Sequence, residues 1–255
     1  MRRLTFAVLY VAIGLSFGCG EAFDTTPRFL QFIQSDDISR IVFEVDYVFD
    51  HGPHWKVGKD MEDDLHKIVD KPSGISVKRD DIIAPRGADH KWTGYEVGEL
   101  IDKTYDLRVP DRTAKVHVLF VDGGFQADSN GSRVLGLAWN YQNIVLFKDN
   151  IMAGCQLNDE KHDAKLMKRF CEKAEKSVWI HEFGHVIGLV DAGLKMTTDH
   201  LDEEHGKHCS NKNCVMYWQH RSSFIFKKLT GRYMEGKEME LGFGQDCLND
   251  IAQVR

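Results

Sequence analysis

The stretch WIHEFGHVIGLVD, residues 179–191, places three polar side chains inside an otherwise apolar segment. His181, Glu182 and His185 have the spacing HExxH, and residues four apart in an α-helix lie on the same face. A buried helix must give these groups a partner, because polar groups left without one cost several kcal/mol. A metal ion held by the two imidazoles is the simplest partner. This requirement constrains the fold more than any other feature of the chain.

The pattern also carries a specific chemistry. Zinc held by three protein ligands keeps a fourth position for water, lowers the pKa of that water towards ~7 and polarises a carbonyl group. Glu182 lies beside the first ligand and can act as general base towards the water. We therefore predict one catalytic Zn²⁺ ion, with Glu182 as catalytic residue and His181 and His185 as metal ligands. The alternative is that HExxH arises by chance and both histidines are core residues.

Gly188 extends the motif to HExxHxxG, which resembles the metzincin group of zinc peptidases. In that group the helix ends at glycine, which enters the left-handed conformation at little cost, and the chain then presents a third ligand. The resemblance implies hydrolysis of peptide bonds in a peptide or protein substrate. It also implies an α/β fold of the α+β kind, with a mixed twisted sheet, packed helices, an active-site helix and a smaller, irregular C-terminal subdomain with a Met-turn.

The third ligand has more than one candidate. Asp191 occupies the standard metzincin position, where snapalysin-like metzincins carry aspartate, and zinc accepts carboxylate oxygen. His208 begins the segment HCSNKNCVM, which resembles archaemetzincins in having histidine, cysteine, four residues, cysteine, one residue and methionine. On this alignment residues 189–207 contain an insertion. We favour His208 as the metal ligand.

Two further histidines, His200 and His205, lie in the same insertion and are the remaining candidates for third ligand. The simpler interpretation of both is that they are polar residues of an exposed loop. Met216 ends the archaemetzincin-like segment, and the resemblance implies that it forms the Met-turn beneath the ligands. The stretch RVLGLAWNY, residues 133–141, resembles the edge strand with which metzincins hold extended peptide.

The N-terminus has the pattern of an export signal. Two arginines precede the apolar run 4–17, which is too short to span a bilayer comfortably, since that takes roughly 20 residues. The sequence LSFGC at its end resembles a bacterial lipobox. We predict a signal peptide over residues 1–18 and membrane attachment through a lipidated Cys19, hence a cell-envelope lipoprotein. The alternative is plain secretion or a periplasmic location.

Export makes the five cysteines after Cys19 candidates for disulfides. Archaemetzincins carry further cysteines, ending in CxxC, that help to bind a second, structural zinc, and this chain has no CxxC. We therefore interpret Cys209–Cys214 as a disulfide that replaces that metal and staples the third ligand to the Met-turn. Cys155–Cys171 is the next pairing, and Cys247 remains unassigned.

The amino-acid composition limits the classes of molecule that this chain is expected to bind. The chain is 42% hydrophobic and 28% charged with a net charge of −6, and it contains no run of lysine or arginine, so nucleic acid is not expected as a partner. We predict a tether over residues 19–38 and a single domain over 39–255, whose C-terminal subdomain begins near residue 188. An alternative interpretation of residues 20–38 is that they form a short propeptide.

Hydrophobic periodicity outlines the secondary structure of this domain. The predicted strands cover residues 41–49, 74–83, 115–123, 133–139 and 143–149. The predicted helices cover residues 60–71, 93–106, 159–176 leading into the motif helix, and 246–254.

A zinc-binding surface lipoprotein without catalysis is the competing interpretation. Glu182 argues against it, because a purely structural site needs no acid beside a ligand and usually has four protein ligands. Hydrolysis of an amide other than a peptide is a further alternative, since zinc and glutamate do not select the acyl group.

Overall fold

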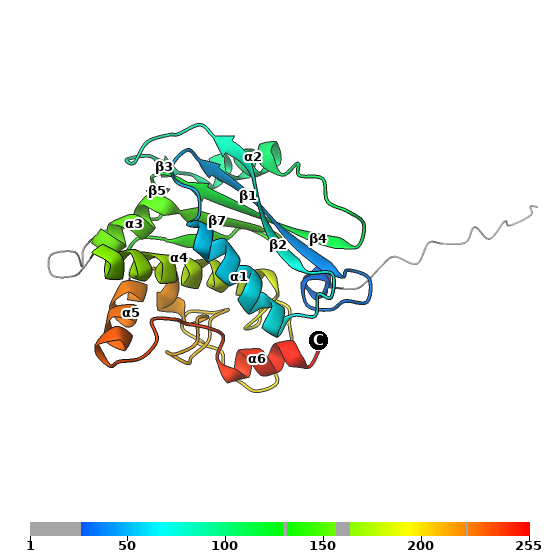
Figure 1. Cartoon of the computed structure of the whole chain (residues 1–255). Coiled ribbons are helices and arrows are strands. Elements are labelled where there is room, and N and C mark those ends of the chain that lie inside the picture. Colours follow the sequence, from blue (N-terminus) through cyan, green and yellow to red (C-terminus); the bar gives the residue numbers. More distant parts are fainter. Residues whose placement is uncertain (1–26, 130–131, 157–163, 223) are drawn as a thin grey trace, which may run out of the picture.

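The structure is a computed structural model that describes residues 27–129, 132–156, 164–222 and 224–255 (Figure 1). The signal peptide predicted for residues 1–18 and the lipid attachment predicted at Cys19 lie outside the described residues. Within them, none of the helices combines the length and the apolar character that a membrane span requires.

A five-stranded sheet in the order β2-β1-β4-β7-β6 forms the centre of the molecule. Four strands are parallel and β6 runs antiparallel to β7 at one edge. Strands β1 and β4 are buried along nearly their whole length because helices cover both faces, which explains their continuous apolar runs. The mixed α/β fold expected from the sequence is confirmed. The strands are β1 (Arg40–Val48), β2 (Ile75–Ile83), β4 (Thr113–Val121), β6 (Gly136–Ala138) and β7 (Asn143–Phe147), with β3 (Lys91–Trp92) and β5 (Gly124–Phe125) in a separate small sheet.

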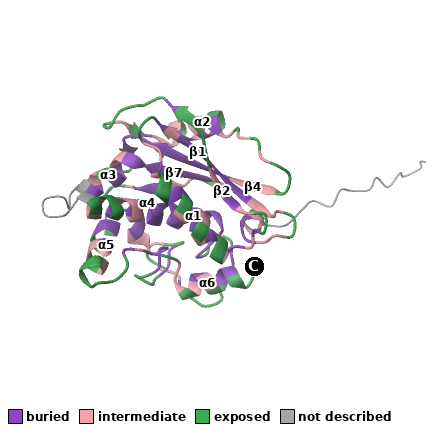
Figure 2. Cartoon of the chain, viewed as in Figure 1, coloured by how far each residue is buried: buried purple, intermediate pink, exposed green. Residues whose placement is uncertain are grey.

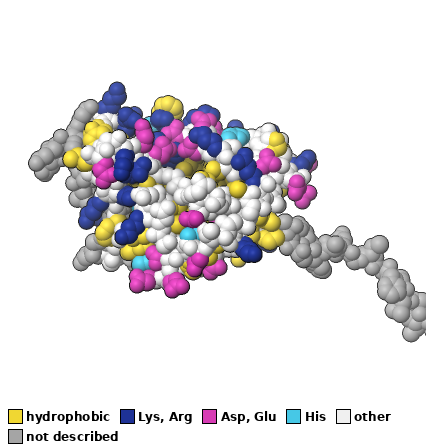
Figure 3. Space-filling view, turned by 90° about the horizontal axis from the view of Figure 1, so that it is seen from below, with side chains coloured by type: hydrophobic (Ala, Val, Ile, Leu, Met, Phe, Trp, Pro, Cys, Tyr) yellow, Lys and Arg dark blue, Asp and Glu magenta, His cyan; other side chains and the backbone are white. Residues whose placement is uncertain are grey.

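Helices pack on both sides of this sheet. Helices α1 and α4 lie below it and α2 lies above it in the view of Figure 1, and the buried residues concentrate between these layers (Figure 2). Helices α5 and α6 and their connecting loops lie beneath α4, where acidic and basic side chains are interspersed on the surface (Figure 3). The helices are α1 (Trp55–Ile68), α2 (Gly94–Thr104), α3 (Lys148–Gln156), α4 (Ala164–Val186), α5 (Phe224–Met234) and α6 (Gln245–Ala252), with short 3₁₀ turns at Arg28–Phe32 and Trp218–Arg221.

Side-chain caps determine where two of the helices begin. Thr93 and Glu96 form a reciprocal capping box at the start of α2, as the predicted helix over 93–106 requires. Helix α1 begins at residue 55, five residues before the predicted start, because the His54 side chain caps it by accepting from the Lys56 amide. Helices α3 and α5 were not expected from the sequence.

The fold also begins earlier than the predicted boundary at residue 39. Phe32 and Ile33 have no exposed surface and belong to the main core. The ring of Phe32 lies 6.4 Å from that of Phe183 in α4. Part of the segment 27–38 therefore packs directly behind the motif helix and contributes to the core.

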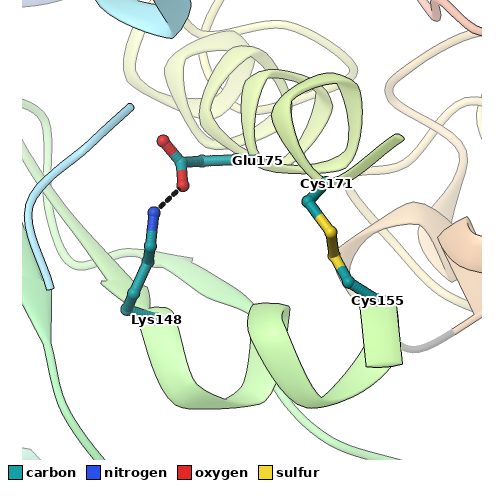
Figure 4. The surroundings of a disulfide bond; sticks show 4 residues. All are labelled: Lys148, Cys155, Cys171 and Glu175. Carbon is teal, nitrogen blue, oxygen red and sulfur yellow. Dashed lines mark hydrogen bonds and ion pairs between the residues drawn. A yellow bond between two sulfur atoms is a disulfide. The ribbon is translucent and has the colours of Figure 1, made fainter. Parts of the chain in front are cut away.

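The Cys155–Cys171 pairing is confirmed, with Cα atoms 5.6 Å apart, and it joins α3 to α4 (Figure 4). Lys148 at the start of α3 forms a buried ion pair with Glu175 of α4 on the same interface. Glu175 also accepts a hydrogen bond of 3.0 Å from the His54 amide, at the start of α1. These contacts fix the motif helix against both of its neighbours.

Candidate metal centre

The HExxH residues occupy the last turns of α4, where the helix passes beneath the sheet. His181 and Glu182 are buried and His185 is half-buried, so the three side chains lie at the boundary between core and surface. The imidazole rings of His181 and His185 have centroids 5.0 Å apart, as expected for residues four apart on one face.

The helix stops at Gly188, as the sequence predicts. The amide of Gly188 donates to the carbonyl of His185, and the amide of Leu189 donates to the carbonyl of Gly184, each at 3.0 Å. Gly188 has φ of +82°, and this pair of bonds with a left-handed residue is the Schellman motif. A Cβ at Gly188 would lie 2.9 Å from the amide nitrogen of Leu194, so the turn also lacks space for a side chain.

The chain after this turn brings His208 back to the helix. One ring nitrogen from each of His181, His185 and His208 lies within 4.8 Å of the other two. The His208 ring centroid is 5.3 Å from that of His181 and 5.0 Å from that of His185. The structure therefore brings together the three histidines that the sequence nominates as metal ligands.

The other candidates for third ligand lie elsewhere. Asp191 is exposed, has φ of 59° and does not belong to the three-histidine group. His205 stacks on the indole of Trp218, with ring centroids 3.8 Å apart. His200 is buried, with 5% of its surface exposed, so its interpretation as an exposed loop residue was wrong.

Hydrogen bonds orient the ligand rings. Nδ1 of His181 donates to the carbonyl of Val215 at 2.7 Å, and Nδ1 of His208 donates to the carbonyl of Gly206 at 2.5 Å. Because a carbonyl only accepts, each Nδ1 carries the proton and Nε2 keeps its lone pair for a metal. Nε2 of His181 is buried and has no hydrogen-bond partner among the described residues.

The electrostatics agree with this assignment. Burial, together with the adjacent His185 and His208, holds the pKa of His181 well below its usual value. A metal binds only the neutral imidazole, so His181 is already in the form that binding needs. A buried nitrogen lone pair in a set of three imidazoles fits a zinc ion.

Glu182 is held by the edge strand. Its Oε2 accepts a hydrogen bond of 2.7 Å from the amide of Ala138 in β6. A Cβ at Gly136 would lie 2.7 Å from Cγ1 of Val178 and 3.0 Å from Cγ of Glu182. Glycine is therefore required at this position for β6 to approach α4 closely enough to orient the glutamate.

Met216 lies directly beneath the motif helix. It has no exposed surface, and a Cβ at Gly184 would lie 2.3 Å from its sulfur. His220 is buried close to the same turn, and burial lowers the pKa of His220 to about 4, which keeps the ring neutral. Sequence reasoning missed His220, since a lone histidine in a polar stretch carries no spacing signal.

A cleft of about 660 Å³ opens beside this centre. One wall is the strand β6 with the following turn, and the opposite wall is the loop that carries His208. The side chains that line it include Trp139, Tyr141, Glu182, His185, His205, Lys207 and His208.

Cys209 and Cys214 do not form the expected disulfide and instead lie in a second group of side chains that could hold a metal ion. Cys209, Cys214 and Cys247 are free and buried. Donor atoms of His200, Cys209 and Cys247 lie within 4.8 Å of one another, and the sulfur of Cys214 is 3.6 Å from that of Cys247. Sequence reasoning missed this group because Cys247 lies on α6, remote in sequence from the other members.

The chemistry of this donor set suits zinc. Hydrogen bonds from Cys214 and Cys247 hold the pKa of Cys209 well below its usual range, and the same contacts raise the pKa of Cys214 and Cys247, so the negative charge of the cluster lies on Cys209. The amide of Gly244 donates to the sulfur of Cys214 at 3.0 Å. Three cysteines and a histidine are a common ligand set of structural zinc sites, which have four protein ligands.

Comparison with known proteins supports the fold. The sequence matches no protein-family model and no curated protein. The structure is similar to the crystal structure of archaemetzincin from Methanopyrus kandleri, with a TM-score of 0.51, covering 85% of this chain and 96% of that chain. Sequence identity is 15%, so the similarity concerns the fold. The chain thus has an archaemetzincin-like fold, in agreement with the resemblance seen in its sequence.

Proposed function

We propose that this protein is a zinc-dependent peptidase. The observation that carries the proposal is the convergence of His181, His185 and His208 beside a glutamate that the edge strand orients, at the wall of an open cleft. A structural metal site would have no use for the cleft or for the oriented acid. The archaemetzincin-like fold supports the same conclusion.

His181, His185 and His208 would hold the ion through Nε2, and zinc would supply a Lewis acid that polarises the substrate carbonyl and acidifies water. Glu182 acts as general base and general acid. Its carboxylate, oriented by the hydrogen bond from Ala138 to Oε2, receives the proton of the attacking water and passes it to the leaving amine. The hydrogen bond to Oε2 stabilises the carboxylate and fixes its rotamer.

Strand β6 is the proposed platform for the peptide. It is the last strand of the sheet and lines the cleft. The amide of Trp139 donates to β7, so by alternation the amide of Ala138 points away from β7, towards Glu182. An extended peptide that adds to this edge would place its backbone along the row of ligands.

The test combines metal content with cleavage of a diverse peptide library. Glu182→Gln should still bind zinc but lose cleavage by about 10²- to 10⁴-fold, the usual contribution of a general base. His208→Ala should lose metal affinity. Asp191→Asn is the matched control, because asparagine tolerates the left-handed conformation, and it should resemble the wild type.

The competing function, a zinc-binding protein without catalysis, predicts a different result. Zinc-loaded wild type would then cleave no peptide, and Glu182→Gln would change nothing but stability. Loss of metal from Asp191→Asn with retention in His208→Ala would instead show that the third ligand is the aspartate.

We also propose that the sulfur-rich group binds a second, structural zinc ion. Its four side chains, His200, Cys209, Cys214 and Cys247, are all buried and come from three separate segments. Without a metal, three packed thiols would add little to holding these segments together. Metal analysis of the purified protein tests this: one zinc per chain, unchanged in Cys247→Ala, would contradict it.

A further inference from the structure

The loop that leads to His208 carries one buried histidine. Most residues from 191 to 207 are exposed or half-buried and belong to no helix or named strand, yet His200 is buried. A single buried imidazole in a polar loop needs partners on both ring nitrogens, since unpaired buried polar groups are costly.

One partner is Asp250 on α6. Nε2 of His200 lies 2.8 Å from Oδ2 of Asp250, whose residue has no exposed surface. The other oxygen of Asp250 accepts from the amide of Thr197 at 2.6 Å and from its hydroxyl at 2.8 Å. One buried carboxylate thus receives three contacts from the same loop.

The opposite side of the ring faces the sulfur atoms. One ring nitrogen of His200 lies within 4.8 Å of the sulfurs of Cys209 and Cys247. Since Nε2 is engaged by Asp250 and Nδ1 is buried without a hydrogen-bond partner among the described residues, we assign Nδ1 to the sulfur group. A carboxylate that fixes one ring nitrogen while the other binds metal is the usual arrangement around ligand histidines.

The buried imidazole is also linked to His208. The amide of Ser210 donates to the carbonyl of His200 at 2.9 Å, and the amide of Asp202 donates to the carbonyl of His208 at 2.7 Å. These bonds form a short antiparallel bridge between residues 200–202 and 208–210. A shift of His200 therefore moves the backbone that carries the third catalytic ligand.

We propose that His200 is a ligand of the second metal ion and that Asp250 acts as its positioning residue, so that this pair locks the loop and sets the position of His208. The inference rests on the second metal ion proposed above. It goes further in two respects: Asp250 orients the imidazole of His200, and the position of His208 in the catalytic site depends on this pair.

The experiment uses the full mature chain with His200→Ala, His200→Cys, Asp250→Asn and, as control, Glu203→Ala, an exposed position of the same loop. Cobalt replaces zinc, because thiolate-to-cobalt charge transfer reports the sulfur site separately from the three-histidine site. Zinc affinity of each site is measured by competition with a chromophoric chelator, and circular dichroism checks folding.

We expect His200→Ala to lose the thiolate–cobalt band and to weaken zinc binding at the three-histidine site by about 10- to 100-fold, the effect typical of lost outer-shell support. His200→Cys should restore the band. Asp250→Asn should weaken both sites less than His200→Ala, and it decides the matter if His200→Ala does not fold. Glu203→Ala should match the wild type.

Two outcomes with His200→Ala would contradict the proposed dependence of the three-histidine site on His200. If His200→Ala lost the thiolate–cobalt band but kept wild-type affinity at the three-histidine site, the two sites would be independent. If it kept both, His200 would not be a ligand. If the wild-type protein bound zinc only at the three-histidine site, the proposed second metal site would be wrong. The proposed peptidase function would not be affected by that result.

Discussion

Replacing Gly184 with alanine tests whether Met216 packs beneath the motif helix as the structure shows. The added Cβ would lie 2.3 Å from the sulfur of Met216 and 3.0 Å from Cε1 of Phe243. Carbon and sulfur atoms in contact normally stand roughly 3.5–4.0 Å apart, so the sulfur must move by at least about 1.2 Å. Met216 has no exposed surface and its neighbours leave it little room.

Two effects oppose each other in Gly184→Ala. Overpacking a core typically costs about 1–3 kcal/mol, whereas replacing glycine by alanine inside a helix gains up to about 1 kcal/mol. We expect the clash to dominate, so Gly184→Ala should lower the free energy of unfolding by about 1–2 kcal/mol. When Met216 is first replaced with alanine, the clash with its sulfur is absent and only the milder contact with Phe243 remains, so Gly184→Ala should then be close to neutral or stabilise the protein by up to about 1 kcal/mol.

The assay is a double-mutant cycle measured by thermal or urea unfolding. For a chain of this size each kcal/mol moves the melting temperature by about 2–4 °C, which is readily measured. Gly98→Ala is the control, because no atom outside its own helix lies within 4 Å of a Cβ built there. If Gly184→Ala stabilised the wild type as much as Gly98→Ala does, the packing of Met216 against the helix would be refuted.

Two further predictions concern the site and the frame that holds it. Gly136→Ala should retain zinc but reduce peptide cleavage by about 100-fold, because displacing β6 by about 1 Å misplaces the carboxylate of Glu182, and unchanged kinetics would show that the strand does not position it. Burial opposes ionisation of Glu240 and Asp64, but hydrogen bonds from the buried Lys176 outweigh it and lower the pKa of both. Carboxylates with lowered pKa stabilise the fold above their unfolded pKa near 4, and this contribution is lost as pH falls through the folded pKa. Urea titrations between about pH 5 and pH 3 should therefore show a smaller loss of stability in Glu240→Gln than in the wild type.

Local patterns in the sequence were sufficient to predict the motif helix and the central strands. The spacing of His181 and His185 and the glycine at 188 act within one helix and its cap, so nearest neighbours decide the outcome. The buried runs of β1 and β4 are equally local, because strands covered on both faces are apolar throughout. Export and lipid attachment were also inferred from a local sequence pattern, and they remain predictions.

Tertiary structure decided which distant residues meet. Both Asp191 and His208 were chemically able to bind zinc, and only the path of the loop around His200 brings the histidine to α4 and leaves the aspartate in solvent. The expected disulfide failed for the same reason. Its cysteines face Cys247 on a helix more than thirty residues further along, since Cys214 and Cys247 are 33 positions apart. Contacts of that range depend on how α6 packs against the rest of the fold, and the sequence of the loop itself contains no pattern from which that packing could be predicted.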